Sequence, residues 1–97
     1  VLALEKPTAV CTIYDATPRI GPAERAALAG FNDVITRAAG VVGLPLLDLR
    51  LICNQVDDFS AVSPIEPSEA GGAKIADAIC RMLAGHDFDA GRTAVWV

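Results

Sequence analysis

The chain has 97 residues, of which 53% are hydrophobic, and its 8 basic and 12 acidic residues give a net charge of −4. This length fits one small domain or part of a larger one. The acidic balance argues against a nucleic-acid partner, because binding to a phosphate backbone depends on clustered Lys and Arg. No apolar run approaches the roughly 18–20 residues of a membrane span, so we expect none.

The first predicted elements are the end of a helix over residues 1–6, broken by Pro7, and a buried strand over residues 8–14. The strand sequence TAVCTIY is rich in β-branched and aromatic residues. Residues 15–21 contain proline and glycine and predict a loop. A helix then begins at Pro22, and its apolar stripe consists of Leu28, Phe31, Ile35 and Ala38.

Gly40 and Gly43 are candidate helix ends, and residues 44–51, LPLLDLRL, predict a second buried strand. Residues 54–67 form a long irregular segment, and loops of this length in compact domains are usually functional. Ser68 is a candidate N-cap for a last helix over residues 69–83. Its predicted apolar stripe consists of Gly72, Ile75, Ala76, Ile79, Met82 and Leu83.

Two glycines, Gly71 and Gly72, lower the helix propensity at the start of this last helix, so we expect close packing against a neighbouring backbone there. Residues 93–97 predict a short edge strand or an extended tail. The order of elements predicts an α/β fold with a parallel sheet and right-handed crossovers. Ligands bind beyond the carboxyl ends of such strands, so the site is expected where loops 15–21 and 54–67 meet.

Cys11, Cys53 and Cys80 are far apart and form no CxxC pair, so we predict no metal site and no cofactor. Each lies beside an apolar residue, and we therefore expect three buried thiols. Free thiols are typical of a reducing compartment and indicate a cytoplasmic location.

Residues 63–79, SPIEPSEAGGAKIADAI, resemble the last conserved block of the SGNH/GDSL hydrolases. That block reads D-x-x-H-P-S, followed by a turn with glycine and an apolar helix. The resemblance covers about residues 7–84 and includes the two strands and the helix before the block. It implies that residues 1–97 are the C-terminal portion of a single SGNH-type domain with a three-layer α/β/α, flavodoxin-like parallel sheet.

The resemblance implies hydrolysis of a small ester or an acylated carbohydrate by a serine nucleophile, with His and Asp partners and an oxyanion hole. The G-D-S nucleophile block is absent from this chain and would lie in a preceding N-terminal half. That half is the expected partner, and these 97 residues alone are expected to be inactive. We expect the isolated piece to be marginally stable or to associate, because part of its core and one sheet edge would be uncovered.

Two substitutions depart from the family pattern: Glu66 occupies the position of the catalytic His, and Ser63 that of its Asp. These are the candidate catalytic residues, although a carboxylate with a pKa near 4.3 is a poor base unless burial raises it. Glu66 could act as a substituted base, pair with a basic group of the missing half, or cap the helix after Ser68. Asp15 and Asp58, one in each loop, are the candidate binding residues, and the alternative for Asp58 is a solvated loop residue.

Two other features of the sequence have a structural explanation that fits better than a functional one. Residues 30–33 spell G-x-N-D, like the family's oxyanion block, but the predicted helix makes coincidence the better explanation. His86 follows the last helix and is better explained as an exposed residue near a helix end than as a displaced base.

Two further functions stay open. One is a non-catalytic SGNH-like binding module, suggested by the substitutions at Ser63 and Glu66. The other is an unrelated doubly wound nucleotide or flavin binder, for which the sequence offers no phosphate-binding glycine loop.

Overall fold

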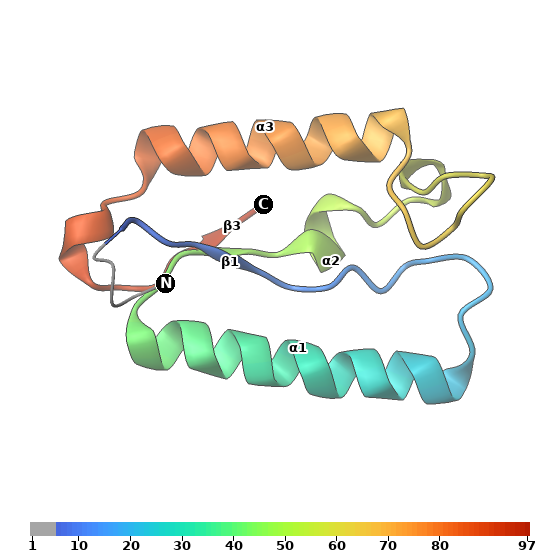
Figure 1. Cartoon of the computed structure of the whole chain (residues 1–97), viewed down its shortest axis with the longest axis horizontal. Coiled ribbons are helices and arrows are strands. Elements are labelled where there is room, and N and C mark those ends of the chain that lie inside the picture. The colour runs from blue at the N-terminus through green and yellow to red at the C-terminus, as the bar shows by residue number, and fades with distance from the viewer. Residues whose placement is uncertain (1–5) are drawn as a thin grey trace.

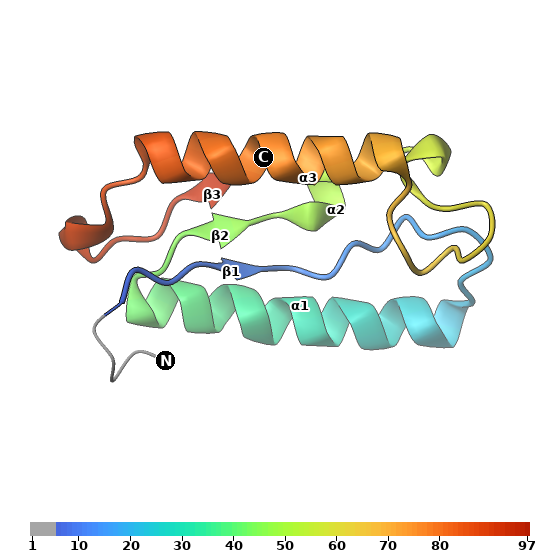
Figure 2. The same cartoon turned by 45° about the horizontal axis from the view of Figure 1, so that its top comes forward.

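Three short parallel strands lie at the centre of the computed structural model, which describes residues 6–97 (Figure 1). The strands β1 (Val10–Cys11), β2 (Leu46–Leu47) and β3 (Val95–Trp96) form one sheet in the order β1-β2-β3. The helix α1 (Pro22–Val42) covers one face and α3 (Glu69–Gly85) the other (Figures 1 and 2). The predicted α/β fold with a parallel sheet is therefore confirmed, whereas the helix end predicted over residues 1–6 falls almost wholly outside the described residues.

The two connections between the strands do not have the same handedness. Both step in one direction across the sheet, from β1 to β2 and from β2 to β3. Their helices α1 and α3 lie on opposite faces (Figure 2). Parallel crossovers that step the same way are both right-handed only when their helices share a face. One of the two crossovers is therefore left-handed, so the prediction of right-handed crossovers holds for one connection and is wrong for the other.

The second predicted strand is only partly a strand. β2 ends at Leu47, and the short helix α2 (Leu49–Ile52) begins directly afterwards. Asp48 starts this helix, because its carboxylate accepts a hydrogen bond from the Arg50 backbone N–H at 3.2 Å and caps the turn. A short apolar run does not distinguish a strand from a buried helical turn, so the sequence prediction extended the strand too far.

The two long helices begin where they were predicted to begin. α1 starts at Pro22 and ends before Gly43, whose φ of 83° places it in the left-handed region. α3 starts after Ser68, whose hydroxyl accepts a hydrogen bond from the Gly71 N–H at 3.1 Å. The predicted N-cap is confirmed, although α3 extends two residues beyond the predicted end at Leu83. None of the helices described in residues 6–97 is long and apolar enough to cross a membrane.

The close packing expected at the start of α3 involves one glycine of the pair. A Cβ atom on Gly71 would lie 2.1 Å from the carbonyl oxygen of Asp58, at the end of the short 3-10 helix η2 (Val56–Asp58). Gly72 has no atom within 4 Å of its Cβ position. Only Gly71 therefore lets the loop approach the helix.

The hydrophobic core lies between the sheet and α3 and consists of Leu47, Ile52, Cys53, Phe59, Ala78 and Met82. The predicted stripes of both helices are partly wrong: Leu83 of α3 and Phe31 of α1 are each 61% exposed. The prediction of buried thiols holds for Cys53 alone, since Cys11 and Cys80 are exposed. A second 3-10 helix, η3 (Phe88–Ala90), connects α3 to β3.

Candidate functional site

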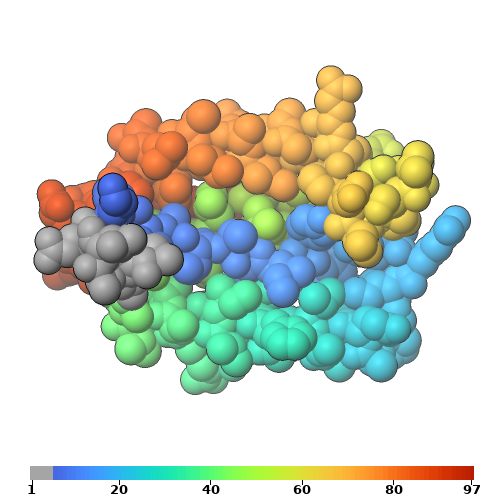
Figure 3. All heavy atoms as spheres, viewed as in Figure 1, coloured from blue at the N-terminus to red at the C-terminus, as the bar shows by residue number. Residues whose placement is uncertain are grey.

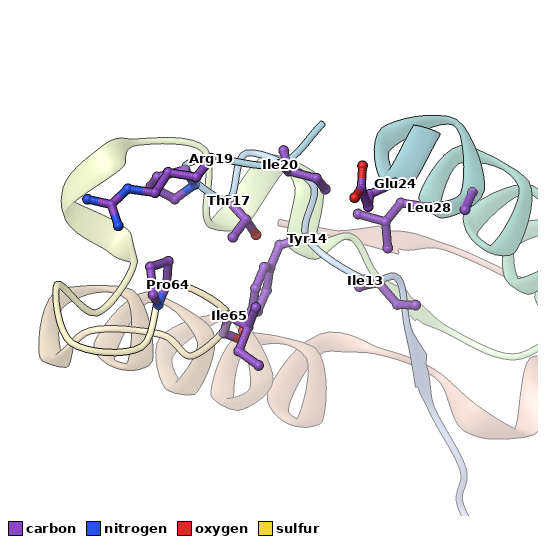
Figure 4. A pocket seen from close by; sticks show the side chains of 11 residues that line it. Ile13, Tyr14, Thr17, Arg19, Ile20, Glu24, Leu28, Pro64 and Ile65 are labelled. Carbon is purple, nitrogen blue, oxygen red and sulfur yellow. The ribbon is translucent and has the colours of Figure 1, made fainter. Parts of the chain in front are cut away.

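A pocket of about 710 Å³ opens beyond the carboxyl end of β1, between the β1–α1 loop, the first turns of α1 and the loop before α3 (Figure 4). Both predicted loops contribute to it, and Tyr14, directly before the first loop, donates a hydrogen bond from its hydroxyl to the Ile65 carbonyl oxygen of the second loop at 2.5 Å. The prediction that the two loops meet is confirmed. The pocket is lined by Ile13, Tyr14, Thr17, Pro18, Arg19, Ile20, Glu24, Ala27, Leu28, Pro64 and Ile65.

Tyr14 is held in place from two sides. Its ring packs edge-on against Phe59 with 5.1 Å between the ring centroids, and its hydroxyl is bonded to the loop before α3. Burial raises the pKa of Tyr14, and the nearby Cys53 and Glu66 raise it further. The phenol therefore stays protonated near neutral pH and acts as a hydrogen-bond donor. Tyr14 was predicted only as part of the first strand and not as a site residue.

Asn32 holds the backbone of Ile13, a residue that lines the pocket, in place. Its amide oxygen accepts a hydrogen bond from the Ile13 N–H at 2.7 Å, and its amide nitrogen donates to the Ile13 carbonyl at 2.8 Å. Asn32 is 1% exposed and lies inside α1, where it binds Ile13 as a neighbouring strand would. The G-x-N-D match thus lies in a helix, as expected, but the buried role of Asn32 was missed.

The candidate catalytic residues Ser63 and Glu66 lie in one turn beside the pocket. The Glu66 N–H donates to the Ser63 carbonyl at 2.9 Å, and the Ser60 N–H donates to the Glu66 carbonyl at 2.9 Å. In the described part of the chain, neither side chain makes a hydrogen bond or an ion pair. They do not form an acid–base pair, and α3 is capped by Ser68 and not by Glu66.

The side chain of Asp58 is not available to a ligand. Asp58 is 1% exposed, and one carboxylate oxygen accepts hydrogen bonds from the Asn54 and Gln55 N–H groups at 3.1 and 3.0 Å. The other oxygen lies 2.7 Å from Lys74 Nζ. The hydrogen bond from Lys74 is the main cause that lowers the pKa of Asp58. Asp58 therefore ties the loop to α3, which corrects both its assignment to binding and the solvated alternative.

Asp15 lies near a second polar cluster at the carboxyl ends of β1 and β2 and does not line the pocket. In this cluster Asp48, which is 5% exposed, accepts from the Thr12 hydroxyl at 3.0 Å and from two Arg50 nitrogens at 2.8 Å each. The hydrogen bonds from Arg50 lower the pKa of Asp48. The negative charge of Asp15 helps to raise the pKa of Arg50, after the larger effect of Asp48. Asp15 itself contributes its backbone carbonyl, which accepts a hydrogen bond from Arg25 at 2.9 Å.

His86 is half-buried, which corrects the expectation that it is exposed. Its Nδ1 accepts a hydrogen bond from Trp96 Nε1 at 3.3 Å, and its ring packs against Phe88. These contacts connect the end of α3 to β3 and give His86 a structural role.

The pocket combines an apolar wall with a few polar groups. Its walls are mainly aliphatic, and Tyr14, Thr17, Arg19 and Glu24 supply the polar groups. Residues 6–97 contain no group of three His, Cys, Asp or Glu side chains placed to hold a metal ion.

Comparison of the chain with models of protein families, with curated proteins and with solved structures found no match.

Proposed function

We propose that this chain is the C-terminal part of an SGNH/GDSL-type ester hydrolase domain and forms one wall of its substrate site. The observation that carries the proposal is the apolar pocket at the carboxyl edge of a parallel sheet, beside the turn that begins the SGNH-like block. In such a domain the serine nucleophile comes from the preceding half of the flavodoxin-like sheet. The 97 residues alone bind substrate without hydrolysing it.

An uncovered surface supports the need for a further part of the domain. β1 is an edge strand, and no described segment pairs with its outer side. Figure 3 shows its blue atoms open between α1 and α3. α1 also carries an exposed apolar seam, which consists of Ala27, Phe31, Val34, Ala38 and Val41. Additional strands beside β1 would remove the open edge, and the segments that connect them would cover the seam.

Glu66 is proposed to face the reacting groups from the missing half. Its side chain has no partner within residues 6–97, and it lies close enough to Tyr14 to affect the pKa of that phenol. The Glu66 side chain is exposed, so it would act as a base only where the missing half buries it, and otherwise it would pair with a basic group of that half. The exposed free thiols Cys11 and Cys80 fit a reducing, cytoplasmic compartment, which is part of the same proposal.

The complete protein tests the proposal with a fluorophosphonate probe and with nitrophenyl esters of increasing acyl length. We expect one serine to be labelled and ester turnover to be measurable. If Glu66 is the base, Glu66→Gln lowers kcat by about 100-fold or more, whereas the exposed control Glu69→Gln leaves it unchanged. A complete protein that is not labelled and does not turn over esters would overturn the proposal.

A non-catalytic binding module is the second candidate. It is favoured by the contact between Ser63 and Glu66, which involves only their backbones. Retained ligand binding without ester turnover in the complete protein would establish this candidate. A nucleotide or flavin binder is the third candidate, and titration with ATP and with FMN tests it; the aliphatic pocket walls argue against it.

A further inference from the structure

We propose that the pocket binds a linear aliphatic carboxylate, with the carboxylate paired to Arg19 and the chain lying against the aliphatic wall. This inference deepens the proposed function, because an acyl carboxylate is the product class of ester hydrolysis. Only that role in the reaction rests on the proposed function. The binding itself follows from the pocket.

The volume and the walls of the pocket select an apolar chain. A volume of about 710 Å³ lies within the usual range for small-molecule sites. Ile13 and Ile65 lie on its walls and are 41% and 76% exposed, so large aliphatic side chains remain in contact with water there. An alkyl chain that covers them removes apolar surface from water without displacing a protein hydrogen bond.

The backbone of Arg19 is strained in a way that indicates a use for its side chain. Arg19 has a φ of 66° and is the only non-glycine residue with positive φ in residues 6–97. It follows Pro18 in a turn, at a position where glycine or asparagine is normally preferred. Strain of this kind concentrates at ligand sites, where the side chain provides something that glycine cannot. At this position an exposed arginine side chain extends outward from the rim of the pocket, as Figure 4 shows, so a carboxylate at the rim meets a cation.

Charge fixes the direction of the ligand. Within the described part of the chain, the ion pairs use Arg37, Arg50, Lys74 and Arg81, so no carboxylate neutralises Arg19. Figure 4 shows Arg19 on one side of the pocket and Glu24, from the first turn of α1, on the other. A carboxylate at Arg19 meets a cation that offers two parallel hydrogen bonds. The reversed ligand would bring its carboxylate to Glu24 and would be repelled.

Calorimetric titration of the purified full-length protein with decanoate and with decanol tests the inference. We expect decanoate to bind more tightly than decanol, because only decanoate pairs with Arg19. Arg19→Gln should weaken decanoate binding by about tenfold and leave decanol binding unchanged. Arg92→Gln removes an exposed arginine outside the pocket and should leave both affinities unchanged.

Arg19→Gly is a second variant that also removes the charge. Because glycine adopts positive φ without strain, this variant should fold even if Arg19→Gln does not. Equal binding of decanoate and decanol, unchanged decanoate binding in both Arg19 variants, or no binding of either ligand would overturn the inference. Absence of serine labelling would overturn the proposed function instead and would leave a charge-selective binding result intact.

Discussion

The two faces of the sheet are held in different ways. On the α3 face, apolar side chains from the sheet, α2, the following loop and α3 form a closed core, with Cys53 and Ala78 fully buried. On the α1 face, the contact depends on the polar clamp between Asn32 and Ile13 and on the small residue Ala39. The large apolar residues Phe31 and Val34 of α1 remain 61% and 65% exposed.

This difference between the two faces indicates that the α3 face mainly stabilises the fold, whereas the α1 face carries the surface available for binding. The α3 face encloses a buried apolar core and satisfies its buried charge at Asp58 within this chain, although Leu83 of α3 stays exposed. The α1 face leaves apolar surface open, and the candidate pocket lies at the start of α1. We therefore expect substitutions on the α3 face to change mainly stability, and substitutions on the α1 face to change mainly binding and association.

The largest effect is expected at Gly71 of α3. Gly71→Ala should destabilise the protein by about 3 kcal/mol, because the new methyl group meets the backbone carbonyl of Asp58 and the loop cannot yield without losing its contacts. The matched variant Gly72→Ala has open space around its Cβ and should stabilise α3 by about 0.5–1 kcal/mol. Urea unfolding followed by circular dichroism measures both, and equal effects would disprove the proposed close approach at Gly71.

The next largest effect is expected at Asp58. Asp58→Ala removes the acceptor of two backbone N–H groups and the partner of Lys74, and should cost about 2–3 kcal/mol of unfolding free energy. Lys74 is 45% exposed and can be hydrated again, which keeps the cost below that of a fully buried pair. The exposed neighbour variant Asp57→Ala should stay within about 0.5 kcal/mol.

The pH dependence of stability gives a second measurement of Asp58. Its pKa is lower in the folded than in the unfolded chain, so its stabilisation is present above about pH 4 and is lost as the pH falls through the folded pKa. We expect Asp58→Ala to flatten this acid loss of stability. The variant should still lose some stability at acid pH, because the pKa of Asp48 is also lowered in the folded chain. An unchanged acid profile in the variant would contradict the assignment.

A smaller effect is expected at the clamp on the α1 face. Asn32→Ala leaves the N–H and the carbonyl of Ile13 without their partner and should cost about 1–2 kcal/mol, since Ile13 is partly exposed and water replaces part of the loss. Asp33→Ala removes only an exposed pair with Arg37 and should cost about 0.5 kcal/mol or less. Hydrogen exchange at the Ile13 amide should accelerate in the first variant alone.

The smallest effect on stability is expected at the apolar seam. The double variant Phe31→Ser and Val34→Ser should change the unfolding free energy by about 0.5 kcal/mol or less, because both side chains are mainly exposed. In comparison, Met82→Ala on the α3 face should cost about 2–3 kcal/mol. Analytical ultracentrifugation should show association of the 97-residue chain and less of it in the double variant. A chain that is monomeric and stable without the substitutions would contradict the open α1 face.

Part of the candidate site was predictable because it depends on connectivity. Parallel strands joined by helices bring their carboxyl ends to one edge, so the meeting of loops 15–21 and 54–67 followed from the order of elements. The roles of individual residues did not follow. In the sequence, Asp58 has the features of a solvated loop carboxylate. In the structure the loop packs against α3, and Asp58 pairs with Lys74, which is 16 positions away in sequence.

Local chemistry determined the helix starts at Pro22 and Ser68 and the helix end at Gly43, because caps and turn residues act within a few positions of the chain. Only the tertiary structure decided which helix faces are buried, which crossover is left-handed, and where Tyr14 and Asn32 point. Those features depend on contacts between distant segments, such as Asn32 with Ile13. A helix with apolar residues on more than one side does not by itself specify which side meets the sheet.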